Sequence, residues 1–353
     1  MIEGIPVKEN GQLNTAPVLI TTLCRYEHFV RLVESLKKSE LAKETDLYVG
    51  LDYPLKESHE KGRAQISDYL DGLTGFRKVV VIRHDHNVGS MMNIRLSREV
   101  LFEENDKYIF SEDDNEFSPG YLEFMNKALV EYESDDKIVA VSGYNYPIEM
   151  GGEAGDVYRM KTYYSAFGFG TWKNKRLNLE NSITYEDFYK NYCNVHKMMQ
   201  LRKISKNQYT NYVKGMLRYI GELVNDNKEV SKIDLSYGLH MFMHGEYMLF
   251  PFVSKVRNWG YDGSGEHCAE MNVDEEKAIS YRNYNYSMQP IDMDEFPGII
   301  TERTVDEAEI DRKLDIFFEV QKKEMLRTDI AYFLSRIIGI DNTARLLSKV
   351  TDR

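Results

Sequence analysis

The sequence predicts an α/β protein with a doubly wound, mostly parallel sheet. Over residues 1–150, short apolar runs alternate with segments whose apolar residues recur at helical spacing. Strands that alternate with helices form right-handed crossover units, which build parallel sheets with helices on both faces. An acidic cluster, Glu112-Asp113-Asp114, directly follows one of the apolar runs. Ligands of open α/β sheets bind beyond the carboxyl ends of the strands, so this cluster marks the expected site.

The elements are expected in a regular order along the chain. The first helix carries Phe29, Leu32, Val33 and Leu36 on one face, and a later one is introduced by Ser118 as N-cap and Pro119 at the first helical position. The expected strands are Val18–Leu23, Leu47–Leu51, Val79–Ile82, Tyr108–Phe110 and Ile138–Val141, and the other helices are Lys56–Leu70 and Ser90–Phe102.

Composition excludes several classes of protein. The 353 residues carry a formal charge of −12 and no dense Lys/Arg run, so we expect no nucleic-acid partner. An anionic small molecule stays open, because a bound metal ion reverses the local charge of an acidic site. The cysteines, Cys24, Cys193 and Cys268, are sparse and unpaired in spacing, and no apolar run reaches the roughly 18 residues of a membrane span. These features predict a cytoplasmic protein.

The acidic cluster has a plain interpretation and a functional one. Most acidic triplets are solvated turns. Adjacent carboxylates after a buried strand repel one another, however, unless a cation or a donor is present. A hard divalent cation shared with a diphosphate would relieve that repulsion, which makes Mn²⁺ or Mg²⁺ the expected cofactor.

Three segments together resemble inverting GT-A glycosyltransferases. They are Pro17–Arg25, Leu51-Asp52, and Phe110–Asp114 with the following Phe117–Tyr121. The nearest types are the N-acetylglucosaminyltransferase I group and its bacterial family-2-like relatives, which carry a Glu-Asp-Asp variant of the Asp-x-Asp signature after the fourth strand. The likeness spans about residues 17–268 and is weak over 173–232. It implies a GT-A, Rossmann-like fold with flanking helices and, in this chain, a C-terminal helical extension.

The resemblance also implies roles for individual residues. Asp114 would be the metal ligand, and Glu112 and Asp113 would contact the ribose and the donor sugar. Arg25, Asp52 and His84 would line the nucleotide pocket. Within the aromatic run 163–172, Gly168 would border the donor sugar, although the run also suits a core.

The loop Asp262–Cys268 is rich in glycine, which lets backbone approach a phosphate closely. Most such loops are merely turns, but bacterial relatives carry a similar run near the donor. Ser264 is therefore expected to contact the diphosphate, and His267 either the diphosphate or the metal ion.

Inverting transfer requires a base that takes the proton of the acceptor hydroxyl. Asp234 resembles the family's catalytic aspartate by its place ahead of a helix, although the usual flanking tryptophan is missing. A helix N-cap is an equally sound interpretation of Asp234. Glu186 and Asp187 are the fallback candidates.

Two further patterns concern the second half of the chain. His240 and His244 are four residues apart, a spacing that suits metal ligation, but Met241 stands where a zinc protease has glutamate, so core or surface histidines are favoured. Near the C-terminus, an apolar stripe favours helix packing or a homodimer contact over peripheral membrane docking. The stripe consists of Ile330, Phe333, Leu334, Ile337 and Ile338.

These observations predict a metal-dependent inverting glycosyltransferase. Residues 1–150 would bind the nucleotide sugar, 151–272 would bind the acceptor and hold the base, and 273–353 would form a linker and helices. We expect a UDP-sugar donor and a saccharide or glycolipid acceptor in surface-polysaccharide synthesis. The protein is expected in the cytoplasm, either free or peripheral to the inner face of the membrane. The alternatives are a sugar-phosphate nucleotidyltransferase and a non-catalytic nucleotide- or carbohydrate-binding protein of the same fold. The former is disfavoured because the loop Thr21–Tyr26 lacks glycine.

Overall fold

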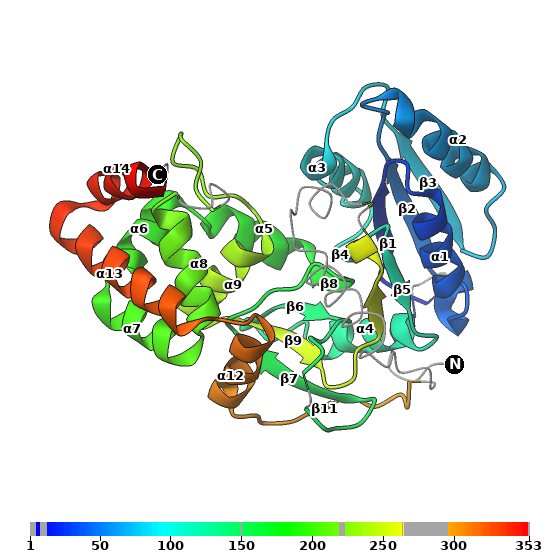
Figure 1. Ribbon diagram of the computed structural model, residues 1–353. Coiled ribbons are helices and arrows are strands. Elements are labelled where there is room, and N and C mark those ends of the chain that lie inside the picture. Colours follow the sequence, from blue (N-terminus) through cyan, green and yellow to red (C-terminus); the bar gives the residue numbers. More distant parts are fainter. Residues whose placement is uncertain are drawn as a thin grey trace.

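A nine-stranded sheet runs through the molecule in the order β11-β7-β9-β6-β8-β4-β1-β2-β3 (Figure 1). The computed structural model describes residues 5–7, 13–148, 150–218, 223–262, 264 and 296–351. Five of the eight pairings in this sheet are parallel, so the predicted mostly parallel α/β architecture is confirmed. The strands are β1 (Val18–Thr22), β2 (Asp46–Leu51), β3 (Lys78–Arg83), β4 (Lys107–Glu112), β6 (Ile138–Ser142), β7 (Asp156–Met160), β8 (Phe169–Trp172), β9 (Tyr247–Pro251) and β11 (Thr301–Glu302).

Helices cover both faces of the sheet because its strands are apolar on both sides. Side chains alternate along a strand, so Val18 and Ile20 enter one core cluster while Leu19 enters the other. The first cluster holds the buried faces of α1 (Tyr26–Leu36), α2 (Glu57–Asp71) and α4 (Tyr121–Glu131). The second holds those of α3 (Ser90–Leu101) and α5 (Lys173–Ser182), and a short 3-10 helix, η1 (Glu40–Glu44), precedes β2.

Helix α4 begins later than the sequence predicts. Gly120 precedes its first residue, and Ser118 does not cap it. The reason is a two-stranded ribbon in which β5 (Asn115–Phe117) pairs antiparallel with β10 (Val256–Asn258). The backbone N–H of Ser118 donates to the Lys255 carbonyl just past the end of this ribbon, so the serine lies between β5 and α4 and does not begin the helix.

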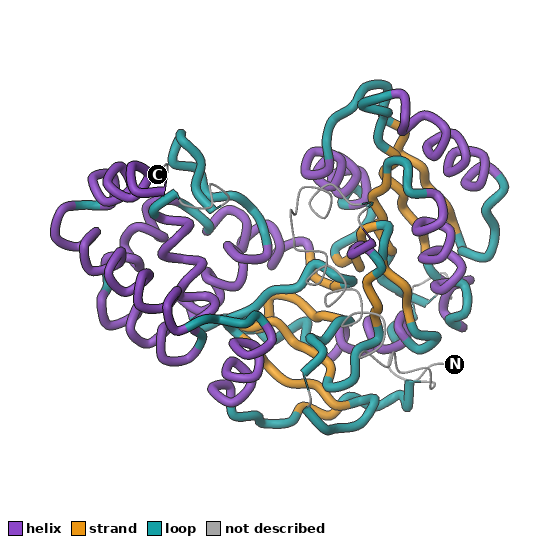
Figure 2. The backbone as a smooth tube through the Cα atoms, viewed as in Figure 1, coloured by secondary structure: helices purple, strands orange, loops and turns teal. Residues whose placement is uncertain are grey.

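The remaining helices gather at one end of the sheet, at the left of Figures 1 and 2. The polar stretch 173–232, over which the family likeness is weak, buries Tyr192, Tyr209 and Tyr212 completely or nearly so. Tyrosine supplies a large apolar ring, and the Tyr192 hydroxyl lies 2.8 Å from that of Ser335. These helices are α6 (Tyr185–Cys193), α7 (Val195–Ile204), α8 (Lys206–Met216), α9 (Asp234–His244), α12 (Glu307–Phe317), α13 (Lys322–Ile338) and α14 (Ile340–Thr351).

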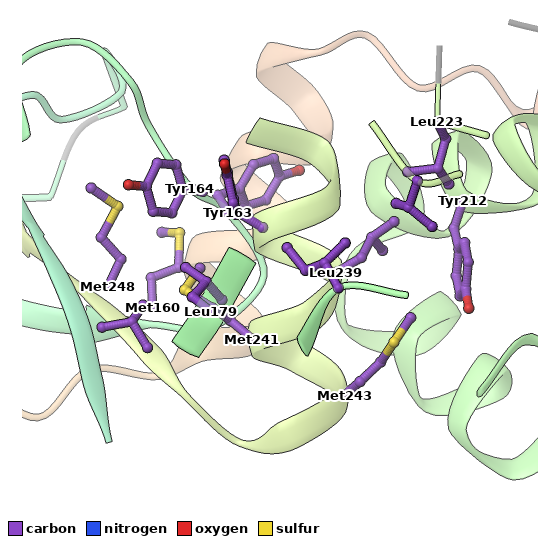
Figure 3. Packing of buried hydrophobic residues seen from close by; sticks show 14 of the residues in the cluster. Met160, Tyr163, Tyr164, Leu179, Tyr212, Leu223, Leu239, Met241, Met243 and Met248 are labelled. Atoms are coloured by element: carbon purple, nitrogen blue, oxygen red, sulfur yellow. The ribbon is translucent and has the colours of Figure 1, made fainter. Parts of the chain in front are cut away.

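Helix α9 joins this helical lobe to the sheet. Figure 3 shows Leu239 and Met241 of α9 between residues near the sheet, such as Met248, and residues of the lobe, such as Tyr212. Seven of its eleven residues are buried, all of them between Ser236 and Met243.

Helix α13 has one buried and one exposed apolar face. Tyr332 is fully buried, whereas Ile330, Phe333 and Ile337 are exposed by 59%, 46% and 80%. Among the described residues, none of the helices combines the length and the apolar character that crossing a bilayer requires.

Candidate active site

The carboxyl ends of β1, β2 and β3 form one edge of the sheet, as the parallel pairing requires. The backbone N–H of Asp52 donates to Thr22 over 3.0 Å, and that of His84 donates to Leu51 over 3.1 Å, so the ladder continues past the strand ends. The acidic cluster lies at the same edge, because β4, which ends at Glu112, pairs parallel with β1.

The two aspartates of the cluster are held by partners from distant parts of the chain. Asp113 accepts a hydrogen bond of 2.6 Å from the Thr22 hydroxyl and forms an ion pair with Arg25. Asp114 lies 3.0 Å from the same guanidinium and accepts a 2.8 Å bond from the Asn258 amide. Arg25, expected to line the nucleotide pocket, therefore contacts the expected metal ligand.

The cluster carries more negative charge than its protein partners neutralise. Burial, together with the charges of Asp114 and Asp113, raises the pKa of Glu112 to about 8. Burial also raises the pKa of Asp114, although the nearby Arg25 opposes this. Among the described residues, one guanidinium pairs with these carboxylates. Oxygen donors with surplus negative charge suit a hard divalent cation, so the residues fit Mn²⁺ or Mg²⁺.

Asp234 begins α9 and does not cap it. The N-cap position belongs to Ile233, and the Asp234 carboxylate instead accepts a 3.1 Å bond from the backbone N–H of Ala166. Burial raises the pKa of Asp234 to about 6, although the residue as a whole keeps part of its surface exposed. Its charge also adds to the raised pKa of Glu112, so the two carboxyls lie within electrostatic reach.

The fallback bases lie elsewhere. Asp187 forms a 2.9 Å ion pair with His244, at the opposite end of α9 from Asp234. At a rise of 1.5 Å per residue, those ends are about 15 Å apart. Glu186 is exposed in the first turn of α6.

A second polar group comes from the loop after β10. The His28 Nε2 atom lies 2.9 Å from Asp262 and 3.3 Å from the Ser264 hydroxyl, and Ser264 also donates to Asp262 over 2.6 Å. Asp262 belongs to the 3-10 helix η2 (Gly260–Asp262). The structure thus brings Ser264 to helix α1, and His267 lies outside the described residues.

The other predicted donor contacts have partners within the protein. Asp52 accepts the backbone N–H groups of Val88 and Gly89, each over 3.0 Å, and so fixes the turn before α3. His84 pairs with Asn93 over 3.1 Å. Gly168 has a φ of 66°, and a Cβ there would lie 2.9 Å from Phe117, which accounts for the glycine by packing alone.

Beside Asp52 there is an open pocket of about 400 Å³. Its lining residues are Tyr53, Pro54, Leu55, Lys56, Glu57, Glu60, Arg63 and Ala64.

Sequence reasoning missed the segment 258–260. Asn258 bonds to Asp114, and the backbone N–H of Trp259 donates to the Asp114 carbonyl over 2.7 Å. A Cβ on Gly260 would lie 2.3 Å from Asp114 Oδ2. No sequence signal marks this segment, because its place depends on the pairing of β10 with β5 across about 140 residues.

Comparison with known proteins adds similarity of layout only. No family model matches the sequence, and no curated protein matches it. One similar solved structure is S. aureus TarS, with 14% sequence identity and a TM-score of 0.33 over 48% of this chain and 30% of TarS. A second is the mannosyltransferase PcManGT from Pyrobaculum calidifontis in complex with GDP-Man and Mn²⁺, with 7% identity and a TM-score of 0.36 over 92% of this chain and 86% of PcManGT. A third is GalNAc-T7 with UDP, GalNAc and Mn²⁺, with 13% identity and a TM-score of 0.40 over 91% of this chain and 58% of GalNAc-T7. The chain covers less than two thirds of TarS and of GalNAc-T7. Its function is argued from its own residues.

Proposed function

We propose that the protein is a metal-dependent glycosyltransferase of the GT-A type, which moves a sugar from a nucleoside diphosphate to an acceptor hydroxyl with inversion. The observation that carries this proposal is the surplus of carboxylates at the end of β4, with Asp234 within electrostatic reach of Glu112. The reaction requires carboxylates that bind a cation and another carboxylate that accepts a proton. The cluster at the end of β4 suits the first task, and Asp234 suits the second.

Asp114 is the proposed metal ligand, supported by its buried carboxylate and its raised pKa. A bound Mn²⁺ or Mg²⁺ would supply positive charge for the leaving diphosphate. The residues around it do the rest. Arg25 offers a second positive charge at the same place, and Asn258 fixes the orientation of the Asp114 carboxylate. Asp113 and Glu112 offer oxygens to the hydroxyls of the donor.

Asp234 is the proposed base. Its carboxylate takes the proton of the acceptor hydroxyl while the hydroxyl oxygen attacks the anomeric carbon. The N–H of Ala166 holds one carboxylate oxygen, which leaves the other for the acceptor. A pKa near 6 suits the task, because the group is then ionised at neutral pH and is still basic enough to accept a proton.

The donor and acceptor are proposed by analogy with the family resemblance. A UDP-hexose or UDP-N-acetylhexosamine is the proposed donor, with Asp52, His84, Gly168, Ser264 and His267 at its binding site. The pocket beside Asp52 offers Lys56 and Arg63 to an anionic group. A saccharide or glycolipid of surface-polysaccharide synthesis is the proposed acceptor. The exposed apolar face of α13 is the proposed contact with a second copy of the chain or with a membrane.

The stereochemistry of the product tests the proposal against its rivals. One displacement by a hydroxyl that Asp234 deprotonates inverts the anomeric centre, so an α-linked UDP-sugar should give a β-linked product. Proton NMR of the anomeric coupling measures this. An α-linked product would contradict inversion. Release of pyrophosphate from a sugar phosphate and a nucleoside triphosphate would point to a nucleotidyltransferase, and donor binding without turnover to a non-catalytic protein.

A further inference from the structure

A second group of metal-ligating side chains lies in the helical lobe, apart from the acidic cluster. Asp187 of α6 and His240 and His244 of α9 each offer one ligand atom, and these three atoms lie within 4.8 Å of one another. Two histidines four residues apart share one face of a helix. The two histidines, which the sequence favours as core or surface residues, thus lie beside a carboxylate from a helix more than fifty residues away in the chain.

The contacts within this group leave His240 unexplained. The His244 Nε2 atom lies 2.9 Å from Asp187 Oδ2, which is a sufficient ion pair by itself. His240, however, is only 2% exposed, its Nδ1 atom has no hydrogen-bond partner, and its Nε2 lies 3.6 Å from Glu246. A distance of 3.6 Å is too long for a hydrogen bond. A buried imidazole without a bonded partner costs free energy, and such groups in native proteins call for an explanation.

The two imidazoles also stack face to face, with ring centroids 4.2 Å apart. Stacked rings cannot both carry a proton at low cost. The Nδ1 atom of His240 is buried and has no hydrogen-bond partner among the described residues, so it is free to offer a lone pair to a cation. The Asn191 amide donates 3.1 Å to Asp187 Oδ1 and thereby directs Oδ2 toward His244. Such a bond to a ligating carboxylate is typical of metal sites.

We propose that Asp187, His240 and His244 bind a divalent transition-metal ion of the Zn²⁺ class. Two imidazoles and one carboxylate form a ligand set of zinc sites, and they differ from the all-oxygen set that Mn²⁺ or Mg²⁺ takes. Tetrahedral ligands at zinc distances are ~3.4 Å apart. Because Asp187 is partly exposed and His244 exposed, small side-chain rotations close the 4.8 Å spread. The ion would link α6 to the last turn of α9, whose first residue is Asp234.

Calorimetric titration of the full chain with Zn²⁺ tests the proposal, with Co²⁺ absorption as a spectroscopic check on tetrahedral coordination. The native protein should bind Zn²⁺. Both His244→Ala and Asp187→Ala should weaken this binding by on the order of a hundredfold or more. His196→Ala on α7 is the matched control, because His196 is exposed and, within the described part of the chain, its ring bonds to Gln200.

Asp114→Asn separates this site from the acidic cluster, and should retain Zn²⁺ binding. Circular dichroism establishes that the variants fold. His244→Ala is the variant least expected to unfold, because His244 is exposed. Absence of Zn²⁺ binding by the native protein, or native affinity in either His244→Ala or Asp187→Ala, would overturn the proposal. Neither result bears on the proposed glycosyl transfer, whose cation is held elsewhere.

Discussion

At the scale of single residues, Asp234 shows how position sets chemistry. As the first residue of α9 it would ordinarily bond to the N–H groups of its own helix. Its carboxylate instead accepts the N–H of Ala166, and burial raises its pKa to about 6. A carboxylate of this kind is mostly ionised at pH 7 and mostly protonated at pH 5, so its protonation state changes near neutral pH.

We predict that Asp234→Asn lowers turnover by roughly a hundredfold or more, the usual loss on removal of a general base, and leaves donor affinity within about twofold. Steady-state turnover and calorimetry with UDP measure the two effects. Glu186→Gln, on an exposed carboxylate of the adjacent lobe, is the control and should be neutral. If Asp234→Asn keeps the native rate, the base lies elsewhere.

The raised pKa gives a second expectation with a definite sign. The reaction requires the carboxylate form, and the folded pKa lies above the ordinary value of aspartate. Turnover should therefore fall as the pH drops through about 6, and the residual turnover of Asp234→Asn should lack this acid limb. A pH–rate profile of both proteins measures it. An identical acid limb in the variant would assign the titration to another group.

The sequence marks candidate residues whose expected role follows from local position. The acidic cluster is visible because it follows a buried strand, and Asp234 because it precedes a helix. Asn258 and Gly260 were invisible, since their contacts with Asp114 arise from a strand pairing between distant segments. Arg25 was found, but its ion pairs with Asp113 and Asp114 could not be foreseen from spacing.

At the scale of elements, the ribbon of β5 and β10 completes the site. It carries Asn258 to Asp114 and sets η2 against the acidic cluster. Gly260, the first residue of η2, lies against Asp114, and a Cβ there would meet the Asp114 carboxylate.

We predict that Gly260→Ala displaces this carboxylate and weakens Mn²⁺-dependent UDP binding by about tenfold or more, since a methyl group at 2.3 Å cannot be accommodated without a shift. The control is Gly72→Ala at the end of α2, where the nearest atom to an added Cβ is 3.9 Å away. Calorimetry with UDP and Mn²⁺ compares the two. Unchanged affinity in Gly260→Ala would show that Asp114 is not the ligand, or that the segment moves freely.

At the scale of the whole molecule, α12 ties the C-terminal helices to the rest of the chain. Its residue Asp311 is 2% exposed and accepts a 2.8 Å bond from the Thr162 hydroxyl. Burial raises the pKa of Asp311 to about 7. The sequence predicts helices within 273–353, but it cannot assign them to a lobe with α8, because the packing of α13 on α8 joins segments about 120 residues apart.

Asp311 makes stability depend on pH in a definite direction. In the unfolded chain the carboxyl has a pKa of about 3.9, so the folded state holds its proton more tightly. The free energy of unfolding should then fall as the pH rises from about 4 to 7. Asp311→Asn removes the ionisable group, and should be more stable than the native protein at pH 8 by roughly 2–4 kcal/mol and nearly equal at pH 4. Urea unfolding at the two pH values measures this. If Asp311→Asn is destabilised equally at pH 4 and pH 8, the raised pKa is not that of Asp311.

The central claim is that the acidic cluster holds a divalent cation for a nucleoside diphosphate. Its most direct test is calorimetry with UDP on the metal-stripped protein, with and without Mn²⁺, on the native chain and on Asp114→Asn. His244→Ala serves as the control for the second metal site. We predict that UDP binds the native protein and His244→Ala only when Mn²⁺ is present. In Asp114→Asn, the affinity for UDP in the presence of Mn²⁺ should fall by about a hundredfold. Equal affinity for UDP with and without Mn²⁺ would contradict the account, and would leave Arg25 as the cation that meets the diphosphate.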